Sequence, residues 1–147
     1  MSDSEQFLHE CMANATAMAE DESLRMKTID WIQAVSSYKY TYNFTWLGLP
    51  IIQFPQDLMA LQQIIWAVQP RVIVETGVAR GGSLIFYASL LELIGGDGEV
   101  LGIDIDLRHH NRDAIMTHPL SRRIRLLDGS STSDGVLLKV RSIVDNR

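Results

Sequence analysis

The stretch of sequence that decides the fold is Val-Ile-Val-Glu-Thr-Gly-Val-Ala-Arg-Gly-Gly-Ser, residues 72–83. It begins with three β-branched apolar residues without polar alternation, which is typical of a parallel strand covered on both faces. The glycines that follow let the backbone turn sharply and approach a ligand closely. Residues 83–94 are apolar nearly all round and predict a buried helix. We therefore expect a strand, a glycine turn and a helix N-terminus whose unpaired N–H groups can hold a small molecule.

The same order of strand, turn and helix recurs downstream. Residues 100–104 and 124–127 predict two further strands. A short polar helix is expected at residues 111–117 and an amphipathic helix at residues 133–144. Alternating strands and helices are typical of right-handed crossovers that build a parallel sheet. The sequence therefore predicts the α/β class, with a Rossmann-like, doubly wound parallel sheet.

The chain before this region follows other patterns. Apolar residues recur at helical spacing over residues 7–18 and 24–35, which predicts a preface of two amphipathic helices, with Cys11 as a small core residue. Residues 38–46 then alternate aromatic and polar side chains, so we expect an extended segment with five aromatics on one face. That face fits packing on the core or on a neighbouring subunit, or alternatively a wall that faces substrate. A core-facing helix is expected over residues 58–68.

Composition and charge exclude several classes of protein. The chain has 147 residues, 46 % of them hydrophobic and 21 % charged, as expected for one folded domain or part of a larger one. Its net charge of −5 and the lack of a basic block argue against a nucleic-acid partner. The single cysteine excludes an intrachain disulfide and a CxxC zinc site. The acidic N-terminus and the lack of an apolar run of about 20 residues predict a cytoplasmic protein without a membrane span.

Glu75 ends the first strand directly before the glycines of the turn, Gly77, Gly81 and Gly82. The dinucleotide pattern GxGxxG is absent, and a Walker-type loop requires lysine after its last glycine, where this chain has Gly82 and Ser83. A carboxylate at this place repels phosphates but can orient a cationic amino-acid group. The segment therefore fits a nucleoside-type cofactor without a pyrophosphate. The alternative is a glycine turn that serves packing alone.

Acidic and small polar residues end the other two strands. Asp104 follows Gly82 by about the 20 residues at which a carboxylate binds ribose hydroxyls in such sheets. With Asp106 it also forms an Asp-x-Asp pair, as in the metal motif of sugar-nucleotide transferases, although capping of the next helix by Asp106 is the simpler interpretation. Gly129 and Ser130 follow the third strand, where they can hold an adenine or form a turn that caps the final helix.

Several ordered motifs carry a resemblance to a known family. They lie at residues 42–48, Pro50 and residues 55–66, 75–83, 102–106 and 129–131. In this order they resemble the cephalosporin hydroxylase and rhamnosyl O-methyltransferase family, and the likeness runs from about Ser37 to the end of the chain. The resemblance implies a class I methyltransferase of Rossmann type that uses S-adenosylmethionine (SAM) to methylate a hydroxyl group. Matched by position, the resemblance implies that the methionine part of SAM is surrounded by Glu75, Gly77, Gly81, Gly82 and Ser83. It implies that Asp104 binds the ribose, and that Gly129 and Ser130 flank the adenine.

The resemblance also implies parts of the family that we expect to lie beyond residue 147. The family continues with a fourth strand whose carboxylates bind a divalent metal ion, expected to be magnesium, close to the substrate. We therefore expect a sheet truncated after the third strand-helix unit, with the metal ligands and the catalytic residues beyond residue 147. Residues 1–54 are then an N-terminal helical and aromatic extended segment, and residues 55–147 are the N-terminal half of a SAM-binding methyltransferase domain. Residues 72–74 form an apolar sheet edge, which predicts aggregation or edge-to-edge pairing, and hence a homo-oligomer.

The predicted function is the cofactor-binding part of a SAM-dependent O-methyltransferase, with no catalytic or metal-binding residue assigned within the chain. Its expected partners are the small-molecule cofactor and a hydroxyl-bearing acceptor, such as a sugar, a lipid-linked glycan or a secondary metabolite. One alternative is a nucleotide- or NAD-binding Rossmann enzyme with a variant glycine loop. The other is an inactive fragment that acts by association, which the apolar edge and the aromatic run favour.

Overall fold

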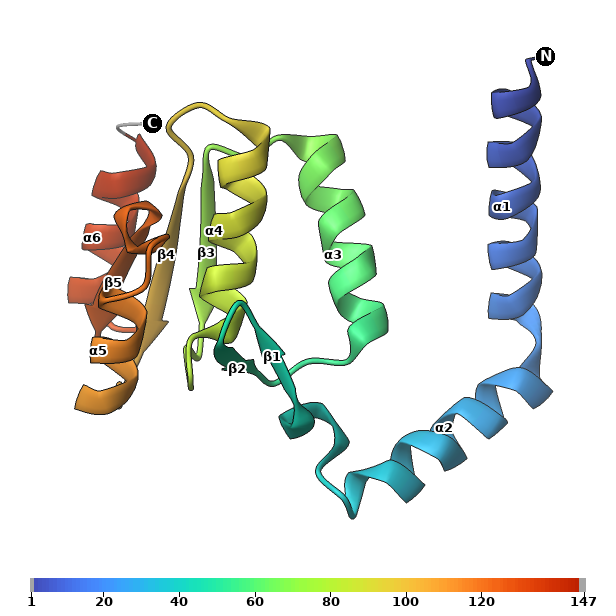
Figure 1. Cartoon of the computed structure of the whole chain (residues 1–147), viewed down its shortest axis with the longest axis horizontal. Coiled ribbons are helices and arrows are strands. Elements are labelled where there is room, and N and C mark those ends of the chain that lie inside the picture. Colours follow the sequence, from blue (N-terminus) through green and yellow to red (C-terminus); the bar gives the residue numbers. More distant parts are fainter. Residues whose placement is uncertain (1, 146–147) are drawn as a thin grey trace. The chain divides into compact units, whose positions relative to one another are not determined.

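The computed structural model describes residues 2–145, which fall into two compact units divided after Tyr40. The first unit holds the two predicted helices, α1 (Asp3–Glu20) and α2 (Glu22–Ser36) (Figure 1). Neither helix buries a residue. The prediction of a core position for Cys11 is wrong, because the apolar side of α1 has no cover within its unit and the thiol is exposed. No helix within residues 2–145 combines the length and the apolar character that crossing a membrane requires.

The aromatic run forms two kinds of structure and not one extended segment. A 3-10 helix, η1 (Tyr40–Asn43), precedes the short strand β1 (Phe44–Trp46). Lys39 has a left-handed φ of +50°, which turns the chain before η1. The predicted common aromatic face is therefore wrong: Tyr38 and Tyr42 are 80 % and 59 % exposed, and only the two aromatics of β1 pack against the core.

The second unit begins with a hairpin that packs on the first helix of the sheet region. Strand β1 pairs antiparallel with β2 (Leu49–Ile51) through a turn with left-handed φ angles at Leu47 and Gly48. Trp46 Nε1 donates a hydrogen bond of 3.1 Å to Ser89 Oγ of the helix α4 (Gly82–Ile94). Ile51 is 1 % exposed, so the end of the hairpin belongs to the core of this unit.

A three-stranded parallel sheet follows, in the order β3-β4-β5, as predicted for a Rossmann-like α/β protein. The strands are β3 (Val72–Thr76), β4 (Glu99–Asp104) and β5 (Ile124–Asp128). The helices of this unit, with one further 3-10 turn, are α3 (Pro55–Val68), α4 (Gly82–Ile94), α5 (His109–Met116), η2 (Ser121–Arg123) and α6 (Asp134–Asp145) (Figure 1). Every predicted helix and strand of this unit from residue 58 onward is present.

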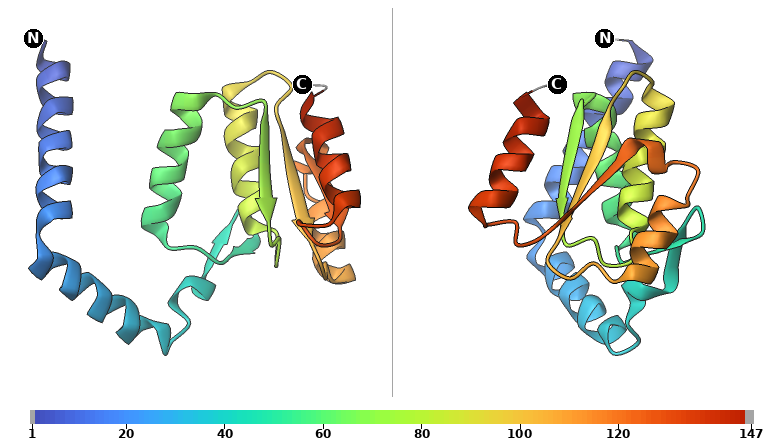
Figure 2. Two further views of the ribbon diagram at one scale, coloured as in Figure 1. Left: turned by 180° about the vertical axis from the view of Figure 1, so that it is seen from behind. Right: turned by 90° about the vertical axis from the view of Figure 1, so that its left-hand side faces the viewer.

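Helices cover the two faces of the sheet unequally. Figure 2 shows α4 and α5 on one face and α6 on the other. The alternation of β4 supplies both cores: Val100 packs into the α4 cluster, whereas Leu101 and Ile103 pack against Val136 of α6. Because α4 is nearly all apolar, seven of its residues are buried, and it anchors both the sheet and the hairpin.

Strand β3 lies at an edge of the sheet, as predicted. Val74 pairs in register with Leu101 and so faces the α6 side. It is 43 % exposed there, because α6 packs on β4 and β5 and does not reach β3. The prediction that this strand is covered on both faces is therefore wrong, while the predicted apolar edge is present.

Candidate functional site

The glycine turn after β3 is a strained loop held by two side chains from elsewhere. Gly77 and Gly81 have φ angles of +85° and +82°, and Ala79 between them has +49°, a left-handed conformation that alanine rarely adopts. The Ala79 N–H donates to Asp104 Oδ2 at 3.2 Å, and its carbonyl accepts from Asn111 Nδ2 at 2.9 Å. Asp104 and Asn111 thus fix the conformation of the loop from β4 and α5.

The last two glycines of the turn allow two close approaches. A Cβ on Gly82 would lie 2.3 Å from the carbonyl oxygen of Pro50 and 2.8 Å from Ile51 Cα, both backbone atoms of the hairpin. A Cβ on Gly81 would lie 2.3 Å from the Ile115 side chain. Packing therefore requires these glycines whatever ligand the loop binds, so the packing interpretation of the turn holds beside the functional one.

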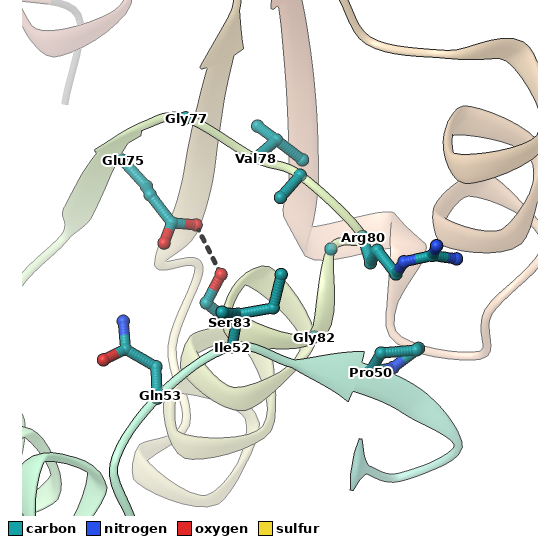
Figure 3. A pocket seen from close by; sticks show the side chains of 11 residues that line it. Pro50, Ile52, Gln53, Glu75, Gly77, Val78, Arg80, Gly82 and Ser83 are labelled. Carbon is teal, nitrogen blue, oxygen red and sulfur yellow. Dashed lines mark hydrogen bonds between the residues drawn. The ribbon is translucent and has the colours of Figure 1, made fainter. Parts of the chain in front are cut away.

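The turn, the end of β3 and the segment after β2 enclose a polar pocket (Figure 3). Glu75 and Ser83 face each other in it, and Ser83 Oγ donates a hydrogen bond of 2.9 Å to Glu75 Oε2. Helix α4 begins at this pocket, and its N-cap residue, Gly81, offers no side chain to the first N–H groups. The pocket thus combines a carboxyl acceptor with the positive end of a helix, which suits a ligand that carries both charges.

The electrostatics of Glu75 differ from those of a surface carboxyl. Burial raises its pKa to about 7, and the hydrogen bond from Ser83 opposes this rise. The same carboxylate, together with burial, raises the pKa of the Tyr87 hydroxyl to about 12, with burial the larger cause. Glu75 is therefore a carboxylate held in an unfavourable environment that a cationic group would relieve.

Glu75→Gln is expected to stabilise the fold at pH 8 more than at pH 5. The raised pKa means that the folded chain binds a proton more tightly than the unfolded chain, so the native glutamate lowers stability as the pH rises from about 4.5 to 7. Allowing for partial exposure, the gain above pH 7 is about 1–2 kcal/mol. Thermal unfolding at both pH values measures it. Glu20→Gln, at an exposed site on α1, is the control, and an equal shift at both pH values would contradict the assignment.

Asp104 ends β4, and its carboxylate oxygens accept hydrogen bonds from backbone N–H groups. Its Oδ2 accepts from Val78 N–H at 2.8 Å and from Ala79 N–H, and its Oδ1 accepts from Asp106 N–H at 2.9 Å. Burial opposes ionisation of Asp104, but the backbone hydrogen bonds outweigh it and lower the pKa of this carboxyl. In this structure Asp104 therefore positions the glycine loop, and its predicted contact with ribose remains a prediction.

A second pocket adjoins the first at Gly77. Asp104, Gly129 and Ser130 line it together with Gly77, so the predicted site residues from all three strands meet at the carboxyl edge of the sheet. Ser130 also organises its own turn, because its Oγ accepts from Thr132 N–H at 3.3 Å and its carbonyl accepts from Ser133. The adenine and turn interpretations of Ser130 therefore both remain compatible with its position.

Two expectations about Asp106 find no support in the structure. Helix α5 begins after Arg108 and has no side-chain cap, so the prediction that Asp106 caps it is wrong. The loop between β4 and α5 is long enough to separate Asp106 from the helix start. Nor do residues 2–145 contain a group of three or more His, Cys, Asp or Glu side chains that could hold a metal ion. The described residues therefore form no metal site of their own, and the magnesium ligands expected beyond residue 147 remain a prediction.

The sequence did not identify every residue of the site. Pro50, Ile52 and Gln53 line the first pocket, and Asn111 holds the loop. No motif marks Ile52, Gln53 or Asn111, because their roles depend on packing between segments far apart in the chain. Pro50 belongs to the motifs that carry the family resemblance. Those motifs marked its segment as part of the family pattern but did not indicate that Pro50 lines the pocket.

Comparisons with known proteins identify a family for most of the chain. The family model for rhamnosyl O-methyltransferase/CmcI matches residues 38–147. A rhamnosyl O-methyltransferase of Mycobacterium leprae (strain TN) is 27 % identical over 99 residues, which cover 67 % of this chain and 41 % of that protein. A rhamnosyl O-methyltransferase of Mycobacterium tuberculosis (strain ATCC 25618 / H37Rv) is 30 % identical over 60 residues, covering 41 % of this chain and 24 % of that protein.

Solved structures agree with the family match. A structure described as "CmcI-N160 apo-structure" is 27 % identical and has a TM-score of 0.54, covering 68 % of this chain and 41 % of its own. Another, described as "cmcI-D160 Mg-SAM", is 26 % identical with a TM-score of 0.52, covering 66 % of this chain and 40 % of its own. The chain thus spans less than half the length of the proteins it matches.

Proposed function

Because the chain belongs to the rhamnosyl O-methyltransferase/CmcI family, we propose that it forms the cofactor-binding part of a SAM-dependent O-methyltransferase. The observation that carries the proposal is the pocket in which Glu75 and Ser83 face the open N-terminus of α4. A sulfonium-linked amino acid has an ammonium group for the carboxylate and a carboxylate for the helix end. The similar structure described with Mg and SAM supports the choice of ligand.

Each part of the cofactor has a candidate partner at the sheet edge. The carboxylate of Glu75 would hold the α-ammonium group, and Ser83 with the first N–H groups of α4 would hold the α-carboxylate. Gly129 and Ser130 would flank the adenine. Asp104 would accept from ribose hydroxyls, which must share its oxygens with the backbone donors of the loop. When bound, SAM supplies a methyl group on a positively charged sulfur.

The chain's own residues would act by binding and orientation. The rigid loop presents the N-terminus of α4 without reorganisation, because Asp104 and Asn111 already hold the loop. Preorganisation of this kind lowers the entropy that binding must offset. The proposal also includes an acceptor hydroxyl on a sugar, a lipid-linked glycan or a secondary metabolite. It includes a divalent metal ion held outside the described residues, association through the β3 edge and a cytoplasmic location.

A nucleotide or NAD ligand is the competing candidate. Glu75 disfavours it, because an anionic carboxylate at the loop repels the pyrophosphate that a dinucleotide-binding loop must hold. Isothermal titration of the whole chain with S-adenosylhomocysteine (SAH) and, separately, with NAD distinguishes the two. We expect saturable one-to-one binding of SAH and no heat of binding with NAD at the same concentrations. Binding of NAD without binding of SAH would contradict the proposed function.

A further inference from the structure

Gln53 occupies a distinctive place in the first pocket. It lies between β2 and α3, outside the strand-turn-helix unit that carries Glu75 and Ser83. Figure 3 shows its side chain extending from the lower segment toward the end of β3 that bears Glu75. The pocket therefore has two walls, one from the sheet edge and one from the segment after the hairpin, and Gln53 supplies the amide of the second wall.

The amide of Gln53 has no hydrogen-bond partner among the described residues. The side chain is half-buried, whereas two other amides of this unit are satisfied: Gln69 Nε2 donates to the Trp66 carbonyl at 2.6 Å, and Asn111 donates to the Ala79 carbonyl. A partly buried amide without a partner in the protein is stabilised when water or a ligand completes it. Gln53 thus offers two donors and an acceptor to whatever enters the pocket.

The backbone around Gln53 is fixed on both sides. Before it, the hairpin lies so close to Gly82 that no Cβ fits between them, and Ile51 is buried. After it, Phe54 is the N-cap residue of α3 and Pro55 occupies the first turn, which sets the entry of the helix. The Gln53 side chain therefore starts from a rigid segment, as a recognition group requires.

We infer that Gln53 is a specificity-determining residue that binds the amino-acid end of the cofactor, an inference that rests on the proposed function. The ionised Glu75 can only accept hydrogen bonds, so it takes the α-ammonium group, and the Gln53 NH2 group donates to the α-carboxylate. The N-terminus of α4 favours the same carboxylate from the other wall. Gln53 and Glu75 together select ligands with an intact amino-acid end over nucleosides that lack one.

The test compares two ligands with the whole chain. SAH carries the amino-acid end, and 5′-deoxy-5′-methylthioadenosine lacks it. In Gln53→Ala we expect the dissociation constant for SAH, measured by calorimetry, to rise roughly tenfold, the loss typical of one hydrogen bond to a charged group. The constant for methylthioadenosine should stay unchanged. Gln53→Glu, which preserves the shape and places a like charge beside the α-carboxylate, should weaken SAH binding further.

Gln56→Ala is the matched control, since Gln56 is an exposed glutamine in the first turn of α3 and does not line the pocket. It should bind both ligands as the unchanged chain does. If the unchanged chain binds neither ligand, the proposed function itself is wrong. If it binds SAH and both Gln53 variants bind SAH equally well, only the role of Gln53 is overturned. Equal weakening for SAH and methylthioadenosine would also overturn it, because the residue would then act on the nucleoside part or on the fold.

Discussion

Asp104→Ala is expected to lower the affinity for SAH by more than tenfold and to destabilise the fold by about 1–3 kcal/mol. Its carboxylate accepts from the N–H groups of Val78, Ala79 and Asp106, and removal leaves the loop donors without a partner. The left-handed Ala79 then relaxes and the first pocket loses its shape, while the second pocket loses the carboxylate proposed to bind ribose. Calorimetry with SAH and urea unfolding measure the two effects.

Asp106→Ala is the matched control for this prediction. Its side chain is exposed, and only its backbone N–H bonds to Asp104, a bond that alanine keeps. We expect SAH affinity and stability close to those of the unchanged chain. If both aspartate variants bind SAH like the unchanged chain, Asp104 neither organises the loop nor contacts the cofactor.

Gly82→Ala is expected to destabilise the chain by about 3 kcal/mol or more. The added methyl group would lie 2.3 Å from the Pro50 carbonyl oxygen and 2.6 Å from its carbonyl carbon. Backbone atoms cannot swing aside as a side chain can, so the hairpin must move away from α4 and expose Ile51 and Trp46. Urea unfolding monitored by circular dichroism gives the free energy, and tryptophan fluorescence reports the displaced hairpin.

Gly135→Ala provides the control at a glycine without such contacts. Nothing lies within 4 Å of a Cβ at this position in α6. Because alanine favours helix more than glycine does, the variant should gain from a few tenths to about 1 kcal/mol. A similar loss of stability in both glycine variants would contradict the close approach of the hairpin to α4.

The sequence predicted the sheet region well because its signals are local. An uninterrupted β-branched run, a glycine turn and an all-apolar helix each follow from periodicity over a few residues, and the structure has β3, the turn and α4 in that order. The carboxyl ends of parallel strands meet at one edge, so the sequence alone placed Glu75, Asp104 and Gly129 near each other.

Features that depend on distant packing could not be predicted in this way. Alternation alone suggested one aromatic face, but a left-handed Lys39 and the η1 turn interrupt the strand. The prediction that β3 is covered on both faces was wrong because α6 packs on the other two strands. Gln53 and Asn111 enter the site only because a hairpin and a helix pack against the loop.

The glycines of the turn can serve packing or ligand binding, and the sequence alone could not distinguish the two roles. Gly81 and Gly82 are required by Ile115 and by the hairpin backbone, whichever ligand binds. Their presence alone therefore does not establish a cofactor site. The uncapped α4 end, the raised pKa of Glu75 and the unpaired Gln53 amide are the independent observations that point to a charged ligand.

Hydrogen–deuterium exchange of the whole chain, with and without saturating SAH, tests the central claim most directly. The claim is that the carboxyl edge of this sheet binds the cofactor. We predict slower exchange of backbone amides at residues 77–83 and 129–133, with no change in α1 or α2. Unchanged exchange in both segments under conditions where SAH binds would contradict the claim.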